Sequence, residues 1–169
     1  LHEVLHTKTE ILMVMEYVEG GDLLEVLNTQ PRFGEQEARH IFAQICCGVS
    51  FCPSLGVAHR DLKPENLLMD ADGHIRLIDM GLAQFVTPQV PTRTSRVGTD
   101  CYMAPEVRWA AKRRTPYGRS ADWYTVGVLL YEFSNGALPY TARDTENPIY
   151  RQGDFHSPEQ KELGESLLK

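Results

Sequence analysis

The sequence predicts a mainly α-helical fold that carries one small β-hairpin. Apolar residues at helical spacing indicate two long helices, one at residues 35–51 and one at residues 120–135. Between them, two short apolar runs at residues 67–69 and 75–78 flank the sequence Asp-Ala-Asp-Gly, which is typical of a turn between antiparallel strands. We therefore expect a helical core with a short hairpin between its two main helices.

Shorter elements are predicted before and after the first long helix. Residues 11–15 form an apolar run that predicts a buried strand. Asp22 can cap a short helix that continues to about residue 27, because its carboxylate can accept hydrogen bonds from the first free N–H groups of a helix. Pro53 and Gly56 are expected to end the first long helix.

The second half of the chain contains a long segment without helical spacing. Residues 84–117 are rich in Thr, Arg, Pro and Gly, and a loop of this length inside a domain is typically functional. Asn135 and Gly136 are expected to end the second long helix. The rest of the sequence is polar, with a helical stretch near residues 158–168.

Composition and charge limit the class of protein. The chain has 169 residues, of which 42% are hydrophobic and 24% charged, and its formal net charge is -6. These values fit one globular domain or a large part of a bigger one, and they exclude an intrinsically disordered chain. The sequence shows no basic stripe and no run of eighteen apolar residues. We expect no nucleic-acid partner and no membrane segment in this chain.

The four cysteines indicate a reducing compartment. Cys46, Cys47 and Cys52 lie in one apolar stretch, and Cys101 is distant in the sequence. No Cys-x-x-Cys pair occurs, and no His/Cys cluster has the spacing of a zinc site. We expect reduced, mostly buried thiols in a cytoplasmic protein.

Polar side chains with complementary chemistry surround the predicted hairpin. Asp61, Lys63 and Asn66 precede the hairpin, and Asp79 follows its second strand. Because a hairpin returns the chain on itself, we expect Asp79 to face Asn66. Carboxylate and amide oxygens are hard ligands that suit Mg²⁺. Phosphoryl transfer needs metal ions, a group that orients the attacking hydroxyl and positive charge on the moving phosphoryl group, and all three are present at compatible spacing.

Several motifs, in order, resemble the signature set of eukaryotic-type serine/threonine protein kinases. They are the sequence HRDLKPEN at residues 59–66, Asp-Met-Gly at residues 79–81 in place of the usual Asp-Phe-Gly, Gly-Thr at residues 98–99 and Met-Ala-Pro-Glu at residues 103–106. The resemblance covers nearly the whole chain. It implies a protein-kinase-like C-terminal lobe, mainly α-helical with a small hairpin.

The resemblance also implies how the chain divides. Residues 1–18 correspond to the end of the N-terminal lobe and the hinge, and residues 19–169 to a C-terminal lobe that is truncated at both ends. The Gly-rich phosphate loop and the strand lysine of the N-terminal lobe are missing from the sequence. Residues 1–73 resemble calcium/calmodulin-type kinases and residues 75–140 the AGC group. We therefore expect an AGC-like kinase with calcium/calmodulin-kinase-like features.

Roles for four catalytic residues follow from the resemblance. Asp61 corresponds to the catalytic aspartate that accepts or orients the proton of the substrate hydroxyl. Lys63 corresponds to the lysine that neutralises the transferred phosphoryl group, and a lysine at this position is typical of Ser/Thr specificity. Asn66 and Asp79 correspond to the two Mg²⁺ ligands. The expected cofactors are ATP and Mg²⁺.

Two further groups of residues are implied for binding. The nucleotide-binding positions are Glu16, Val18, Asp22, Glu65 and Leu68. The positions that hold basic residues upstream of the target hydroxyl are Glu65 and Glu132, with assistance from Asp22. We expect protein substrates with upstream basic residues, and the alternative for these carboxylates is a solvated surface.

Residues 79–106 correspond to the activation segment. Ser95 aligns with the activating phosphosite of many kinases, and Arg60 is its expected partner because arginine pairs well with phosphate. The alternatives are an unmodified loop serine or phosphorylation of Thr94 or Thr99 instead. Thr99 corresponds to the threonine that contacts the catalytic aspartate and lysine. Asp122 corresponds to the aspartate that hydrogen-bonds the backbone of the catalytic loop, and a simple helix N-cap is the alternative.

The predicted function is ATP-dependent phosphorylation of serine and threonine residues in proteins. Because half of the nucleotide cleft is missing from the sequence, we expect little or no phosphotransfer by these 169 residues alone. One alternative is a pseudokinase or scaffold fragment that binds partners without catalysis, which the four intact catalytic residues argue against. A small-molecule kinase is another, which residues 99–106 argue against because this segment builds a peptide-docking surface in protein kinases.

Overall fold

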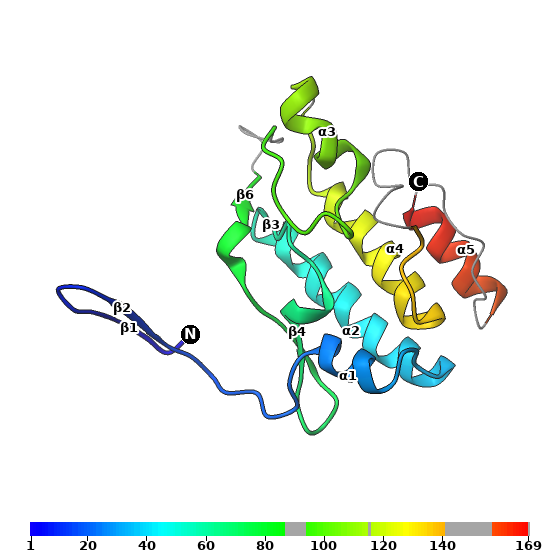
Figure 1. Cartoon of the computed structure of the whole chain (residues 1–169), viewed down its shortest axis with the longest axis horizontal. Helices are drawn as coiled ribbons and strands as arrows, with labels where there is room; N and C mark the ends of the chain where they lie inside the picture. Colours follow the sequence, from blue (N-terminus) through cyan, green and yellow to red (C-terminus); the bar gives the residue numbers. More distant parts are fainter. Residues whose placement is uncertain (87–93, 115, 141–156, 169) are drawn as a thin grey trace.

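Two helices packed against each other form the centre of the structure. α2 (Glu35–Ser54) and α4 (Ser120–Asn135) lie in the middle of the body (Figure 1). α4 is buried on nearly all sides, whereas α2 buries one face, whose apolar residues have helical spacing. The mainly helical core is therefore confirmed. The computed structural model describes residues 1–86, 94–114, 116–140 and 157–168.

The small hairpin is present and is fastened to α2. Strands β4 (Leu67–Met69) and β5 (Ile75–Leu77) pair antiparallel, with Leu68 opposite Arg76. The side chain of Gln44 donates to the backbone oxygen of Gly73 at 2.9 Å and accepts from the backbone N–H of Ile75 at 3.0 Å. One helix side chain thus fixes the turn and one strand of the hairpin.

The helix ends lie close to the predicted positions. Asp22 caps α1 (Leu23–Thr29), because its carboxylate accepts from the N–H of Glu25 at 2.9 Å. α2 continues through Pro53 to Ser54, slightly beyond the predicted end. Gly136, with a φ of +70°, ends α4 in the left-handed conformation that glycine adopts without a steric cost.

The segment predicted as one long loop contains regular structure. β6 (Gln84–Phe85) pairs antiparallel with β3 (Val57–Ala58), a 3₁₀ turn η2 (Met80–Leu82) precedes it, and α3 (Pro105–Arg113) follows. The loop prediction for residues 84–117 is therefore wrong in part. Proline is favourable in the first turn of a helix, and the Pro and Arg content concealed the short buried face of α3. Residues 87–93 and 115 lie outside the described residues.

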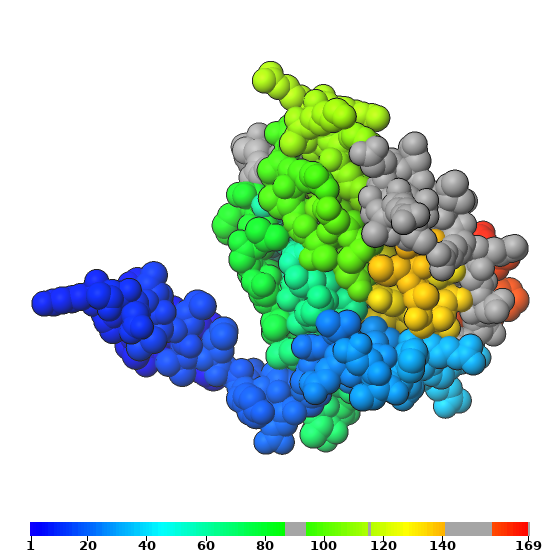
Figure 2. Space-filling view, viewed as in Figure 1, coloured from blue at the N-terminus to red at the C-terminus, as the bar shows by residue number. Residues whose placement is uncertain are grey.

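The predicted strand near the N-terminus exists but is not buried. β1 (Glu3–His6) and β2 (Ile11–Val14) form an antiparallel hairpin that extends away from the helical body (Figures 1 and 2). The side chains of Ile11 and Met13 are 65% and 61% exposed. An apolar run predicts a strand, but it does not predict a layer that covers the strand, so the expectation of burial is wrong here.

The last described helix is α5 (Pro158–Leu167), which confirms the helical stretch predicted at the end of the sequence. α5 packs on α4 (Figure 1), and the approach is close at Gly127, where a Cβ atom would lie 2.7 Å from Cβ of Leu167. Within the described ranges, none of the helices combines the length and apolar character needed to cross a membrane. All four cysteines are free thiols.

Candidate active site

Helix α4 holds the loop that carries the sequence HRDLKPEN. The Asp122 carboxylate, in the first turn of α4, accepts from the backbone N–H groups of His59 at 2.8 Å and Arg60 at 2.9 Å. Asp122 is 6% exposed, and burial raises the pKa of its carboxyl despite these two donors. The N-cap of α4 is Arg119, so the contact expected from the resemblance is present and the N-cap alternative for Asp122 is wrong.

The His59 ring joins this loop to the end of the small hairpin. His59 is 1% exposed, and its Nε2 lies 3.0 Å from the backbone oxygen of Ile78. The backbone N–H of Asp61 donates to His59 Nδ1 at 3.3 Å. Because a backbone amide only donates, Nδ1 is the accepting nitrogen and Nε2 carries the proton. The ring therefore spans the two segments.

Lys63 and Thr99 surround the Asp61 carboxylate. The Thr99 hydroxyl donates to Asp61 Oδ1 at 2.7 Å, and Lys63 Nζ lies 3.1 Å from Asp61 Oδ2. Lys63 Nζ also donates to Thr99 Oγ1 at 3.2 Å. Burial acts to raise the pKa of Asp61, but the Thr99 hydrogen bond and the Lys63 ammonium outweigh burial and hold the pKa below its ordinary value. Asp61 is thus an ionised carboxylate beside a cation and a hydroxyl.

Asn66 and Asp79 lie at the two ends of the hairpin. Asn66 Nδ2 donates to the backbone oxygen of Asp61 at 2.8 Å, and the backbone N–H of Ile78 donates to the backbone oxygen of Asn66 at 3.0 Å. Asp79 comes next, with a left-handed φ of +60°, and its Oδ1 accepts from the N–H of Gly81 at 3.0 Å. The hairpin brings Asp79 next to Asn66 along the chain path, but no hydrogen bond between their side chains is found among the described residues.

The donors at the ends of the hairpin fit a hard cation. Asn66 uses its Nδ2 for protein hydrogen bonds, and no described residue donates to its Oδ1, which can serve as an oxygen ligand. The Asp79 side chain is exposed, and one of its carboxylate oxygens has no hydrogen bond within the described part of the chain. One amide oxygen and one carboxylate make a suitable pair for Mg²⁺, which prefers oxygen ligands and retains several waters.

Gly98 lets the chain of the activation segment lie directly against the Asp61 loop. Its φ is +107°, and a Cβ atom at this position would lie 2.4 Å from the backbone oxygen of Arg60. No other residue type fits this approach without movement of the backbone. Thr99 follows Gly98 directly, so the close approach sets the position from which Thr99 reaches Asp61.

Arg60 binds the activation segment at a second point. Its Nη1 donates to Ser95 Oγ at 3.1 Å and to the Tyr117 hydroxyl oxygen at 3.2 Å. Its Nε donates to the backbone oxygen of Leu82 at 2.8 Å. The Tyr117 hydroxyl in turn donates to the backbone oxygen of Ser95 at 2.7 Å. Ser95, predicted as a modification site, is exposed and already lies beside the predicted arginine.

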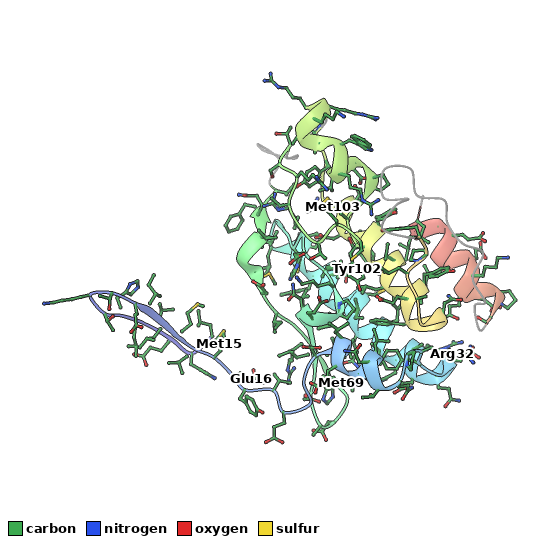
Figure 3. The ribbon with its side chains drawn as sticks, in the orientation of Figure 1. Met15, Glu16, Arg32, Met69, Tyr102 and Met103 are labelled. Carbon is green, nitrogen blue, oxygen red and sulfur yellow. The ribbon has the colours of Figure 1, made fainter. Side chains whose placement is uncertain are left out.

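Two carboxylates predicted to bind substrate lie near each other beside Tyr102. The Tyr102 hydroxyl donates to Glu132 Oε2 at 2.9 Å. Burial raises the pKa of Glu132 to about 7, the Tyr102 hydrogen bond opposes this shift, and the charge of Glu65 adds to it. Glu65 Oε2 is buried and has no hydrogen-bond partner among the described residues. Figure 3 shows Tyr102 in the middle of the body, above the small hairpin.

Comparison with known proteins agrees with this geometry. The protein kinase domain family matches residues 1–168. The chain belongs to the protein kinase family. In this kinase-family chain the expected signature residues therefore occupy one connected region, formed by the HRDLKPEN loop, the hairpin and the segment around Thr99.

Several curated kinases are similar to this chain. CBL-interacting serine/threonine-protein kinase 8 from Arabidopsis thaliana is 37% identical over 170 residues, which cover 99% of this chain and 38% of the relative. Protein kinase C zeta type from Oryctolagus cuniculus is 37% identical over 155 residues, which cover 92% of this chain and 25% of that relative. Ribosomal protein S6 kinase alpha-1 from Homo sapiens is 37% identical over 149 residues, which cover 88% of this chain and 20% of that relative. The chain therefore spans less than two fifths of the length of these relatives.

The mixed resemblance to kinase groups agrees with these relatives. The protein kinase C and ribosomal protein S6 kinase matches are of the AGC type and extend over most of the chain. The CBL-interacting kinase matches nearly the whole chain at the same identity. The chain thus combines AGC-like features with likeness to a kinase of another kind.

The residues expected to bind nucleotide are only partly brought together in this kinase-family chain. Asp22 and Leu68 lie side by side in a β-bridge, although one oxygen of Asp22 caps α1 by accepting from Glu25. Val18 is half-buried. Glu16 is exposed on the segment that connects β2 to the body (Figure 3). The structure therefore groups Asp22 with Leu68, and the Glu16 carboxylate lies 3.8 Å from Nε of Arg76, the residue opposite Leu68 in the small hairpin.

Sequence reasoning missed two tyrosines of the site. Tyr117 connects Arg60 to Ser95, and Tyr102 holds Glu132. Neither contact follows from a motif or a spacing rule, because both partners are distant in the sequence. The signal that could have found them is burial, since Tyr117 and Tyr102 are only 4% and 6% exposed and a buried tyrosine hydroxyl needs a partner.

Proposed function

We propose that the protein phosphorylates serine and threonine side chains of other proteins with ATP as the phosphoryl donor. The observation that carries the proposal is the contact of the ionised Asp61 carboxylate with Lys63 and Thr99. A carboxylate that can orient a hydroxyl, placed beside a cation that can neutralise phosphate, suits phosphoryl transfer to an alcohol. Membership of the protein kinase family and the serine/threonine kinases among the relatives support the same reaction.

In the proposed mechanism Asp61 orients the attacking hydroxyl. As the hydroxyl oxygen bonds to the γ-phosphorus, the bond from that phosphorus to the β–γ bridging oxygen breaks, and the hydroxyl proton passes to Asp61 and then to solvent. Lys63 places positive charge beside the transferred group. Asn66 and Asp79 would hold Mg²⁺, which would supply positive charge beside the phosphates when bound. Because the pKa of Asp61 is low, orientation is its larger contribution.

The preferred substrates in this proposal carry basic residues upstream of the target hydroxyl. Glu65 and Glu132 place two carboxylates at one position, and Glu65 keeps a buried oxygen without a partner in the described part of the chain. A guanidinium group would satisfy that oxygen and remove the repulsion between the two carboxylates. Asp22 assists less, since one of its oxygens caps α1.

Phosphorylation of Ser95 is part of the proposal. Arg60 already donates to Ser95 Oγ, so a phosphate on this oxygen would gain a charge-assisted hydrogen bond from the guanidinium group. The backbone N–H of Arg60 is held by Asp122, which connects the modification to the loop that contains Asp61. Phosphorylated Ser95 would therefore fix the activation segment on the catalytic loop.

The proposed division of the chain follows the kinase lobes. Residues 1–18 form the end of the N-terminal lobe and the hinge, and residues 19–169 belong to the C-terminal lobe, with ATP bound between the two lobes. These 169 residues on their own are expected to transfer little phosphate, because they contain no Gly-rich loop and their hinge residue Glu16 is exposed. The four free thiols support an intracellular, cytoplasmic location.

The test is a kinase assay on the full natural protein with Mg²⁺ and ATP. Two peptides are compared, each with one serine, one with arginines upstream of it and one with alanines at those positions. We expect phosphoserine in both and a kcat/KM about 10-fold higher for the arginine peptide, the ratio that corresponds to one charge-assisted contact. Nucleotide binding without transfer to either peptide would instead favour a pseudokinase or scaffold.

A further inference from the structure

Three successive backbone carbonyl groups after Thr99 are held by side chains from three parts of the fold. Arg108 Nη2, on α3, donates to the oxygen of Asp100 at 2.8 Å. The Tyr140 hydroxyl, beyond α4, donates to the oxygen of Cys101 at 2.6 Å. The Thr125 hydroxyl, on α4, donates to the oxygen of Tyr102 at 2.9 Å. The segment that follows Thr99 is therefore fastened at every residue.

Arg108 and Tyr140 act together in this arrangement. Arg108 Nη2 also donates to the Tyr140 hydroxyl oxygen at 2.9 Å, and the guanidinium carbon lies 5.0 Å from the centre of the Tyr140 ring. Both residues are buried, with exposed fractions of 8% and 3%. Removal of an arginine from water is costly, so a buried arginine is favourable only where it makes several good contacts. Here those contacts lead to the backbone beside Thr99.

The fastened segment starts one residue after the contact with Asp61. Thr99 donates to Asp61 Oδ1 and accepts from Lys63. Its chain neighbours are Gly98 and Asp100, so the position of the Thr99 backbone depends on both of them. Gly98 lies against the backbone of the Asp61 loop. On the other side, the Arg108 guanidinium group donates a hydrogen bond to the backbone oxygen of Asp100. Thr99 is thus fixed from both directions along the chain.

We infer that Arg108, together with Tyr140, is a positioning residue that sets Thr99 against Asp61 and shapes the surface where the acceptor peptide binds. The inference rests on the proposed kinase function. Neither side chain contacts Asp61, so both act through the backbone of residues 100–101. Loss of either contact should let Thr99 shift, which impairs orientation of the acceptor hydroxyl but leaves the nucleotide side of the site unchanged.

The test compares Arg108→Met, Arg108→Lys and Tyr140→Phe in the full natural protein. The measurements are kcat, KM for peptide, KM for ATP and melting temperature, with kcat expressed per nucleotide-binding site. We expect kcat/KM for peptide to fall about 10- to 100-fold in Arg108→Met, as for small misplacements in other enzymes, with partial recovery in Arg108→Lys. Tyr140→Phe keeps the aromatic ring but loses the hydroxyl, and should lower kcat/KM for peptide about 2- to 10-fold, the effect of one hydrogen bond. KM for ATP should stay within about 2-fold of the wild-type value in all three variants, a change too small to reflect a lost contact.

Arg113→Met is the matched control, because Arg113 is an exposed arginine on the same helix that contacts only the Trp109 ring among described residues. It should behave as the wild type. If Arg108→Met does not fold, Tyr140→Phe decides the matter. Wild-type kcat/KM in Tyr140→Phe, or a lower melting temperature with unchanged kinetics in both variants, would overturn the inference. Absence of phosphotransfer in the wild type would contradict the proposed function instead.

Discussion

Asp61 and Glu132 are both surrounded by protein, yet their pKa values move in opposite directions. Burial acts to raise both, but Asp61 also has the Thr99 hydrogen bond and the Lys63 ammonium, which lower its pKa below the ordinary value. Glu132 has a tyrosine hydroxyl and a second carboxylate nearby, and its pKa rises to about 7. Asp61 is therefore ionised at any working pH, whereas the charge of Glu132 changes near neutrality.

The pKa of Glu132 predicts pH-dependent binding of basic peptides. As pH rises through about 7, Glu132 loses its proton and the ionised carboxylate attracts an upstream arginine more strongly. We expect KM for the arginine peptide to fall between pH 6 and pH 8 by about 3- to 10-fold, the range of a charge-assisted hydrogen bond. The alanine peptide serves as the control and should show no such fall. Retention of the full pH dependence by Glu132→Gln would contradict this assignment.

Ionisation of Glu132 also affects stability. The pKa of Glu132 is about 7 in the folded state and 4.5 in the unfolded chain, so the folded state binds this proton more tightly. The contribution of Glu132 to the free energy of unfolding therefore decreases as pH rises from 4.5 to about 7. The Tyr102 hydrogen bond opposes the raised pKa of Glu132, and the charge of Glu65 adds to it, so both change the size of the effect. The direction stays the same, because burial is the largest cause and raises the pKa of Glu132.

Gly98 predicts a second effect of a single residue. Gly98→Ala would place a Cβ 2.4 Å from the backbone oxygen of Arg60 and would force backbone movement beside Thr99. Gly73→Ala is the matched control, because Gly73 also has a positive φ, +82°, but open space around it. We expect both variants to lose about 1–3 kcal/mol of stability from backbone strain, and only Gly98→Ala to lose more than about 10-fold in kcat. Equal kcat values in the two variants would show that the close approach does not position Thr99.

At the scale of elements, α4 organises the site. Its first turn binds the Asp61 loop through Asp122, its middle binds the segment after Thr99 through Thr125, and its last turns carry Glu132. The helix is buried on nearly all sides, so these three side chains are attached to a fixed element. Short loops that would otherwise move are therefore held at defined positions relative to each other.

The Asp122 contacts predict how much stability depends on this attachment. In Asp122→Asn, one of the two backbone N–H groups of His59 and Arg60 loses its acceptor and faces a second donor. We expect a loss of about 1–3 kcal/mol in the free energy of unfolding, measured by urea titration of the full natural protein. Asp72→Asn, on the exposed turn of the hairpin, should change it by less than about 0.5 kcal/mol. A loss in Asp122→Asn no larger than this would show that α4 does not hold the loop.

The sequence predicted elements best where one local rule decides them. Helical spacing located α2 and α4, and the Asp-Ala-Asp-Gly turn located the hairpin β4–β5. Prediction from the sequence failed for α3, whose short buried face lies among Pro and Arg residues, and for the exposure of β2. Within the site, motifs identified Asp61 and Lys63, whereas contacts between distant residues, such as Arg108 with Tyr140, could not be read from spacing.

At the scale of the whole molecule, the chain consists of a helical body and a projecting hairpin (Figures 1 and 2). The body holds the Asp61 cluster, the segment around Thr99 and the two carboxylates Glu65 and Glu132. The hairpin β1–β2 exposes apolar side chains, and Glu16 lies on the segment that connects it to the body. The residues proposed for the acceptor side therefore lie in the body, whereas Glu16 and Val18, two of the residues proposed for nucleotide binding, lie on the segment that leads to the projecting hairpin.

We propose that Asp61 is the residue on which phosphoryl transfer by this protein depends most directly. The direct measurement is kcat for peptide phosphorylation by the full natural protein and by Asp61→Asn, with the dissociation constant of ATP determined in parallel. The asparagine keeps the shape and can still accept the Thr99 hydrogen bond, but it lacks the negative charge that orients the attacking hydroxyl and it cannot take the proton. We predict a fall in kcat of about 10²- to 10⁴-fold with ATP affinity unchanged. A wild-type kcat in Asp61→Asn would contradict the account.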